Sequence, residues 1–356
     1  MTYPPDAGRL LATLRDGAWL DAQVFPPLAY AVPEIVPEGA VLLAAAPKAG
    51  KSWLALSISL AAASGGKALG LDVPKRPVLY AALEDGDRRL QDRCRRLLGT
   101  DPIPPEFQYL TRLEPGRAAD TIAAWTQFRD EPLIILDTLG RVMPPALPGE
   151  SNYQRDYRIG SALKRIVDDR PGMTLLVIHH DRKADAADWI DSINATHGLA
   201  GAMDTIIVIS RDRNETSGLL KVTGRDVAEG EYAVRFKDGA VWELDGPDLA
   251  IAREKAQKVR ATTRATAGAG DRMLDVVLYA YAHPEGVRRG DVAKALHMEP
   301  KAATVYLARA VDAGRLQRAE RGLYTPVISV TSVTSEGADN TDNTDNTPQE
   351  GDPDEG

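Results

Sequence analysis

Residues 45–52 read AAPKAGKS and join an apolar run, VLLAAA, to a helical pattern, SWLALSISLAAA. The segment matches the phosphate-loop motif G-x-x-x-x-G-K-S/T, with Ala45 in place of the first glycine. Gly50 allows close approach of the backbone, and N–H groups of the loop and helix N-terminus surround phosphates. No other feature constrains the fold as strongly, because the motif requires a strand before the loop and a helix after it.

The loop residues have expected roles. We expect Lys51 to reach the β- and γ-phosphates of ATP and the Ser52 hydroxyl to help hold Mg²⁺. The alternative is an ordinary Gly-Lys-Ser turn before a helix. The predicted nucleotide-binding residues are Ala45, Ala46, Pro47, Lys48, Ala49, Gly50, Lys51, Ser52 and Trp53.

Apolar runs alternate with helical patterns along residues 39–247, after a lead-in over 1–38 that has a helical pattern at 7–19 and then a proline-rich extended stretch. This alternation predicts an α/β domain with a mostly parallel sheet covered on both faces. The last three strands lack intervening helices, so we expect them to form an antiparallel extension. Strands are predicted at 40–45, 77–83, 133–136, 174–179, 205–210, 218–223 and 232–236, and helices at 52–63, 87–98, 118–128 and 153–169.

Two acidic residues follow apolar strands. Asp137 ends LIILD at the carboxyl edge of the sheet, where ligands bind, and is expected to hold Mg²⁺ through water; the alternative is an Asp that caps the next turn. Thr138 follows it, so the general base must come from elsewhere. Glu84 follows a strand that we expect beside the phosphate-loop strand, and it is the predicted base. Alternatively, residues 84–86 form only a polar turn.

His179 and His180 end the apolar run TLLVIHH. One of them is expected to contact the γ-phosphate and report its hydrolysis, although the sequence does not decide which, because neighbouring strand residues face opposite ways. The alternative is that the two histidines only end the strand and do not contact the γ-phosphate. Two adjacent histidines without further ligands make a poor metal site.

The order of six segments resembles that of the RecA-like ATPases of the plasmid RepA hexameric-helicase type, which are common in phages and plasmids. These are APKAGKSWLAL, VLYAALEDGDRRLQDR, LIILDTLGR, VIHHDRKAD, GLAGAMDTIIVISRDR and LLKVTGRDV, over roughly residues 25–245. The resemblance implies a RecA-like sheet and a ring of subunits with ATP at the interfaces. It matches Lys51 and Ser52 to the phosphate-loop pair, Glu84 to the catalytic glutamate, Asp137 to the Walker B acid, and His179 or His180 to the histidine of the fourth strand.

The same resemblance implies an arginine that reaches the neighbouring subunit's nucleotide. Arg211, Arg213 and Arg225 are the candidates, and Arg225 is favoured because Lys221 precedes it by four residues. The alternative for each of them is an arginine that is merely exposed to solvent at the end of a strand. Residues 181–197 correspond to a region that faces the pore in RecA-like rings, where Arg182 and Lys183 would contact DNA phosphates. Four Asp residues in this segment would repel a nucleic-acid backbone, so a catalytic linkage or a subunit contact is the alternative role.

A basic segment at 248–270, with a charge balance of +3, reads as a linker that is helical at first and then flexible. Residues 271–328 predict a winged helix-turn-helix domain, with helices at 271–281, 291–296 and 300–314 and a two-stranded wing. Such domains bind DNA or other proteins. The predicted DNA contacts are Lys301, Thr304, Arg318 and Arg321, and the predicted core is Met273, Val276, Val277, Val292, Leu296, Val305, Leu307 and Leu316.

Charge and composition exclude few functions. Residues 329–356 carry eight acids and no Lys or Arg, which predicts a disordered tail; the remainder has 43 basic and 43 acidic residues, so nucleic-acid binding is not excluded. The single cysteine argues against disulfides and Cys-based zinc sites. No apolar run approaches the ~20 residues of a membrane span and no signal peptide is evident, so we expect a cytoplasmic protein without membrane contact.

Together these features predict an Mg-ATP-hydrolysing, ring-forming (hexameric) DNA helicase or DNA-dependent ATPase of phage or plasmid replication. It would act on single-stranded DNA, with a primase or initiator as a possible partner. Two alternatives remain open: an ATP-regulated replication or partition regulator without unwinding activity, and a recombination mediator.

Overall fold

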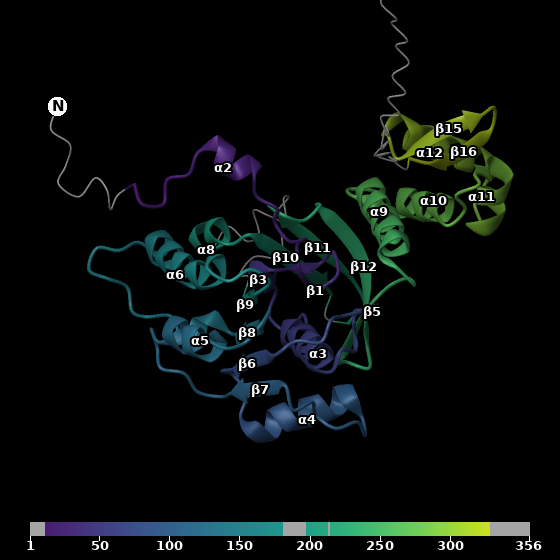
Figure 1. Ribbon diagram of the computed structural model, residues 1–356. Helices are drawn as coiled ribbons and strands as arrows, with labels where there is room; N and C mark the ends of the chain where they lie inside the picture. The colour runs from purple at the N-terminus through teal and green to yellow at the C-terminus, as the bar shows by residue number, and fades with distance from the viewer. Residues whose placement is uncertain (1–10, 181–196, 213, 328–356) are drawn as a thin grey trace, which may run out of the picture. The chain divides into compact units, whose positions relative to one another are not determined.

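The computed structural model describes residues 11–180, 197–212 and 214–327. The chain divides into two compact units, Met1–Val259 and Arg260–Gly356, and each is described by itself (Figure 1). The predicted acidic tail lies outside the described residues. In the part of the chain that is described, no helix combines the length and apolar character needed to cross a membrane.

The first unit is built on a nine-stranded sheet within the described residues. From β10 to β7 the strands are parallel, whereas β11, β12 and β13 each run antiparallel to their neighbour. The mixed, mostly parallel α/β architecture is therefore confirmed. In spatial order the strands are β13 (Val241–Leu244), β12 (Gly230–Lys237), β11 (Ser217–Gly224), β10 (Thr205–Arg211), β3 (Gly39–Ala45), β9 (Thr174–His180), β8 (Leu133–Asp137), β6 (Val78–Ala82) and β7 (Phe107–Leu110).

Helices cover both faces of this sheet (Figure 1). On one face α3 (Lys51–Ser64) and α4 (Asp87–Leu98) pack against alternate strand residues such as Val41 and Ile178. On the other face α5 (Ala118–Thr126), α6 (Asn152–Asp168) and α8 (His197–Ala202) pack against the residues between them, such as Leu42 and Val177. Burial of both faces explains why the central strands are continuous apolar runs.

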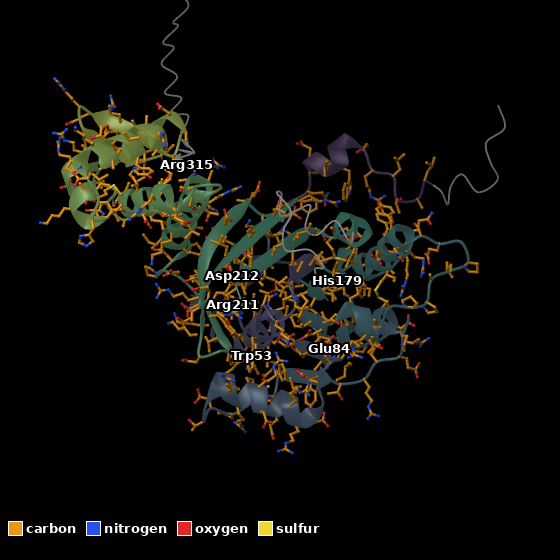
Figure 2. The ribbon with its side chains drawn as sticks, turned by 180° about the vertical axis from the view of Figure 1, so that it is seen from behind. Trp53, Glu84, His179, Arg211, Asp212 and Arg315 are labelled. Carbon is orange, nitrogen blue, oxygen red and sulfur yellow. The ribbon has the colours of Figure 1, made fainter. Side chains whose placement is uncertain are left out.

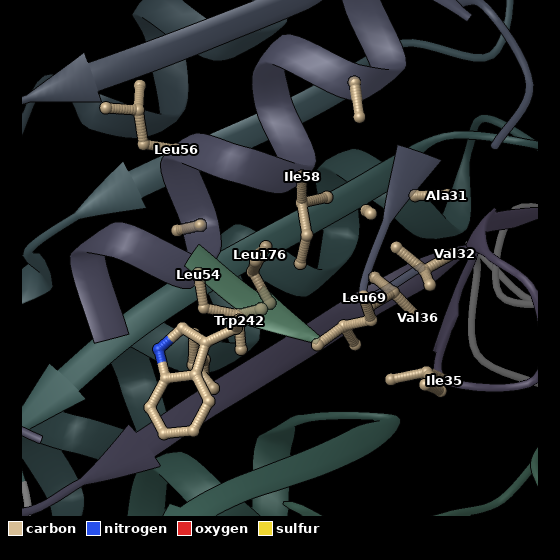
Figure 3. Close-up of a cluster of buried hydrophobic side chains, with 14 of the residues drawn as sticks. Ala31, Val32, Ile35, Val36, Leu54, Leu56, Ile58, Leu69, Leu176 and Trp242 are labelled. Carbon is tan, nitrogen blue, oxygen red and sulfur yellow. The ribbon is translucent and has the colours of Figure 1, made fainter. Parts of the chain in front are cut away.

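Figure 3 shows part of the first cluster, where Leu54 and Ile58 of α3 lie near Leu69 and Trp242. The proline-rich lead-in reaches the same cluster through a short hairpin, β1 (Tyr30–Val32) and β2 (Val36–Pro37), rather than remaining simply extended. A second small pair, β4 (Lys67–Ala68) and β5 (Leu71–Asp72), follows α3.

The predicted order of strands needs correction. The strand at 77–83, expected beside the phosphate-loop strand, is β6, and β9 and β8 lie between it and β3. The strand at 205–210 is β10, which is parallel to β3, so the antiparallel extension begins only at β11. It ends with β13, which was not predicted, and neither was β7. Alternating apolar runs indicate that strands exist, but they do not specify which strands are neighbours.

The prediction of a helix at 7–19 is wrong over residues 11–16, whereas residues 17–19 are helical as expected. Within the described part, residues 11–16 are not helical and α2 covers only Gly17–Asp21. The Asp16 carboxylate accepts a hydrogen bond from the Trp19 N–H at 2.8 Å, which fixes the helix start at this point.

The basic segment after the sheet is helical as α9 (Leu249–Thr266). The second unit contains α10 (Asp271–Tyr281), α11 (Arg289–Ala295) and α12 (Pro300–Asp312). Its three-stranded sheet has the order β14 (Val287–Arg288), β16 (Leu323–Pro326) and β15 (Leu316–Glu320), of which β14 was not predicted.

Most of the predicted core of this unit is buried. Val305 is the exception and is 48% exposed, because α12 turns Ala303, Leu307 and Ala310 inward at helical spacing. The buried members are Val276, Val277, Val292, Leu307 and Leu316, and the partly buried ones are Met273 and Leu296.

Candidate active site

The phosphate loop joins β3 to α3 through two residues in the left-handed region. Lys48 has φ +66° and Gly50 has φ +105°, and α3 starts at Lys51. The Lys51 Nζ donates to the carbonyl oxygens of Ala45 at 2.6 Å and Ala46 at 3.2 Å, so its stem is buried against the loop. The structure thus brings the lysine and the N-terminus of α3 to the same loop.

A residue from β13 closes one side of this loop. The Trp242 Nε1 donates to the Gly50 carbonyl oxygen at 3.1 Å. A Cβ on residue 50 would lie 2.9 Å from the same Nε1. Gly50 is therefore required both by its φ and by the tryptophan, whose role no motif revealed.

Asp137 lies at the end of β8 on the α3 side of the sheet. Its Oδ1 accepts a hydrogen bond from Ser52 Oγ at 3.2 Å and its Oδ2 accepts one from Tyr80 Oη at 2.6 Å. Burial raises the pKa of Asp137, although both hydrogen bonds act in the opposite direction. Burial and the neighbouring Asp137 carboxylate raise the pKa of Tyr80 well above its usual value, so the phenol is a donor.

The pair formed by Ser52 and Asp137 fits a magnesium ion. Both supply hard oxygen atoms, and magnesium usually takes few protein ligands together with water and phosphate oxygens. No group of three or more His, Cys, Asp or Glu side chains suited to a metal occurs among the residues described. A metal held by this pair would therefore depend on the nucleotide for further ligands.

The two acids after β6 have different surroundings. Glu84 Oε1 accepts a hydrogen bond from Thr138 Oγ1 at 3.2 Å and lies 3.8 Å from Arg141 Nε. Asp85 is paired with Arg93 and with Arg89, the latter at 3.5 Å. The Glu84 side chain is 41% exposed and therefore has access to water. The Asp85 side chain is only 9% exposed and is fixed by its two ion pairs.

Glu84 reaches the site although β6 is not beside β3. Ala82 is in register with Asp137, and this pairing places Glu84 next to Thr138. His179 lies in β9 beside Ala44 and shares a face with Leu175 and Val177, opposite to α3. His180 is in register with Ala45, and its side chain is outside the described residues.

Arg211 lies against the phosphate loop of its own chain. Arg211 is labelled in Figure 2. Its Nη2 donates to the Lys48 carbonyl oxygen at 3.4 Å and its Nε to that of Ala49 at 3.5 Å. Its guanidinium carbon lies 4.6 Å from the centroid of the Phe236 ring. These contacts explain the position of Arg211 without a neighbouring subunit.

Arg225 lies at the opposite end of the strands, away from the phosphate loop: it follows Gly224, which is in register with Thr205 at the start of β10. Its guanidinium is 3.7 Å from Asp204, whose carboxylate also accepts the Ala40 N–H at the start of β3. The Arg225 side chain is 64% exposed. Arg213, Arg182 and Lys183, the remaining residues of the first unit that were expected to contact a neighbour or DNA, lie outside the described residues.

The four predicted DNA contacts of the second unit are on its surface. Lys301 and Thr304 lie at the start of α12, where Thr304 Oγ1 donates to the Pro300 carbonyl oxygen at 3.0 Å. Arg318 lies in β15 with its guanidinium 5.5 Å from the Tyr324 ring, and Arg321 is in the turn before β16.

Comparison with known proteins gives the family. The family model described as AAA domain (AAA_25) matches residues 4–186, just over half of the chain. The chain belongs to this AAA domain family. Membership supports the prediction of an ATPase and of nucleotide binding at the loop.

Two further comparisons add less. No curated protein matches the chain. Among solved structures, the chain is similar to the crystal structure of the RadB recombinase, with 16% sequence identity and a TM-score of 0.42, over 59% of this chain and 91% of that one.

Proposed function

We propose that the protein is a RecA-like ATPase that forms a ring and couples Mg-ATP hydrolysis to movement on single-stranded DNA. The observation that carries the ATPase is the meeting of Lys51, Ser52 and Asp137 at the carboxyl edge of a parallel sheet. Catalysis of phosphoryl transfer is largely positioning and charge stabilisation, and these residue types supply both.

Each residue has a role in this proposal. Lys51 exchanges its carbonyl partners for phosphate oxygens when ATP enters the loop. Ser52 and Asp137 hold Mg²⁺, which neutralises charge on the phosphate oxygens when bound. Glu84 orients a water and accepts its proton as the water oxygen attacks the γ-phosphorus and ADP leaves. Glu84 is favoured over Asp85 because only Glu84 is open to water.

Ring formation and helicase activity are inferred from the order of motifs in the RepA-type helicases. In this proposal Arg225 acts on the neighbouring subunit, because it lies at the end of the strands away from its own loop. Arg211 instead supports the loop of its own subunit. A hexamer in phage or plasmid replication, with a primase or initiator as partner, completes the hypothesis.

The second unit is proposed to be a winged helix-turn-helix domain. The order of α10, α11, α12 and the β15–β16 hairpin supports this interpretation. Lys301 and Thr304 lie at the start of α12, the candidate recognition helix, and Arg318 and Arg321 on the wing provide cations for phosphate contacts. Protein binding by this unit is the competing outcome.

The test combines ATP hydrolysis with strand separation. Lys51→Ala should abolish hydrolysis and weaken nucleotide binding, whereas Lys67→Ala, a surface lysine just beyond α3, should leave both unchanged. Wild-type protein should hydrolyse ATP faster with single-stranded DNA and separate a forked duplex. Stimulation without strand separation would favour the regulator or the recombination mediator, and normal turnover by Lys51→Ala would refute the phosphate-loop assignment.

A further inference from the structure

The two oxygens of Asp137 are held by hydroxyl groups from different elements. Oδ1 accepts from Ser52, the first residue after the loop lysine, at 3.2 Å. Oδ2 accepts from Tyr80 of β6 at 2.6 Å, the shorter of the two bonds. The carboxylate therefore has one oxygen beside Ser52 at the phosphate loop and one directed toward Tyr80 in the buried cluster on the α3 face of the sheet.

Tyr80 is completely buried in a strand whose other residues are apolar. Its ring lies against that of Phe107, with centroids 5.9 Å apart, so it cannot turn its hydroxyl to solvent. A buried hydroxyl without a hydrogen-bond partner is destabilising, so the position of this hydroxyl depends on the carboxylate that it contacts. A phenylalanine would have filled the same space without this requirement.

We propose that Tyr80 is a positioning residue for the metal-holding carboxylate: it occupies Oδ2 and thereby presents Oδ1 to the ion beside Ser52. The inference rests on the proposed function, because it assumes that Asp137 holds magnesium during ATP binding. Groups that hydrogen-bond to metal ligands fix the ligand geometry, and their loss typically lowers metal affinity about 10–100-fold.

The experiment compares Tyr80→Phe with Tyr109→Phe. Tyr109 lies in the adjacent strand β7 and also contacts Phe107, but it is 46% exposed and is not bonded to Asp137. A fluorescent ATP analogue is bound at increasing free Mg²⁺ and, separately, in EDTA. For Tyr80→Phe the half-saturating Mg²⁺ concentration should rise about 10–100-fold, with metal-free affinity unchanged. Tyr109→Phe should resemble wild type in both.

Two results would overturn the proposal. One is an unchanged Mg²⁺ requirement in Tyr80→Phe; the other is an equal loss of affinity with and without metal, which would indicate a merely structural hydroxyl. A wild-type protein that binds the analogue with no Mg²⁺ dependence would instead contradict the assumed role of Asp137. The three outcomes therefore separate the inference from the proposed function.

A second variant keeps the test valid if Tyr80→Phe also lowers the melting temperature. In an Asp137→Asn background, Tyr80→Phe should cause no further rise in the Mg²⁺ requirement, because its effect passes through the carboxylate. An additional rise of the original size in that background would show that Tyr80 does not act through Asp137.

Discussion

At the scale of single residues, the acids of the site differ in their ion pairs and in their exposure to water. The adjacent acids Glu84 and Asp85 differ because Asp85 forms ion pairs with Arg89 and Arg93 of α4, whereas Glu84 lies beside Thr138 and Arg141. The sequence could single out the loop residues, since their expected roles depend on neighbours along the chain. It could not predict Tyr80, because a tyrosine in the apolar strand VLYAA has the pattern of any core residue.

Glu84→Gln should retain ATP binding and lower turnover about 10²–10⁴-fold, because the amide cannot accept the proton of the attacking water. Steady-state hydrolysis and equilibrium nucleotide binding measure the two effects. Asp85→Asn is the matched variant: it should lower the melting temperature by weakening the pairs with Arg89 and Arg93 while turnover falls less. The reverse ranking of turnover would make Asp85 the base.

At the scale of elements, the phosphate loop is supported by β10, the parallel neighbour of β3, and by β13 of the antiparallel extension. β13 brings Trp242 to Gly50, and β10 brings Arg211 to Lys48 and Ala49. The sequence predicted most strands and helices because buried parallel strands are continuous apolar runs. It could not predict the neighbours of β6 or the contact of β13 with the loop, since both depend on pairings between distant segments.

Gly50→Ala should impair folding and nucleotide binding together. The new Cβ would meet Trp242 Nε1 at 2.9 Å, in addition to the strain of φ +105°. Gly70→Ala is the control, because its φ is +87° but nothing lies within 4 Å of the new Cβ. Strain alone costs roughly 1–3 kcal/mol. Thermal unfolding should show a larger loss for Gly50→Ala, and equal losses would mean that the tryptophan contact does not constrain the loop.

The thiol of Cys94 reports the packing of α4. Burial raises the pKa of Cys94 to about 11, and the side chain lies in the core between α4 and the sheet. A thiol-specific reagent at pH 8 should therefore react slowly with native protein and completely in denaturant, because the thiolate is the reactive form. Since the chain has one cysteine, the signal has one source. Rapid reaction of native protein would contradict the packing of α4.

At the scale of the whole molecule, Arg211 and Arg225 lead to opposite predictions for the proposed ring of subunits. Arg211 contacts the loop of its own chain, whereas Arg225 pairs with Asp204 at the end of the strands away from that loop. In the proposed ring, Arg225 would therefore act on the nucleotide of the neighbouring subunit. A head-to-tail ring joins different faces of adjacent subunits, so the loop of one can meet the strand end that carries Arg225 in the next. Sequence patterns could not distinguish these cases, because both arginines follow strand-like runs.

Mixing inactive variants distinguishes the two arginines. In rings mixed equally from Lys51→Ala and Arg225→Ala, an interface is intact when an Arg225→Ala subunit supplies the loop and a Lys51→Ala subunit supplies the arginine. Random assembly makes about a quarter of the interfaces intact, so about a quarter of wild-type turnover should return if interfaces act independently. Lys51→Ala mixed with Arg211→Ala should regain nothing, because every subunit lacks one of two groups needed in the same chain. If turnover returns in the mixture with Arg211→Ala and not in the mixture with Arg225→Ala, Arg211 is the arginine that acts on the neighbouring subunit. If light scattering shows a monomer that hydrolyses ATP at the full rate, no arginine acts between subunits.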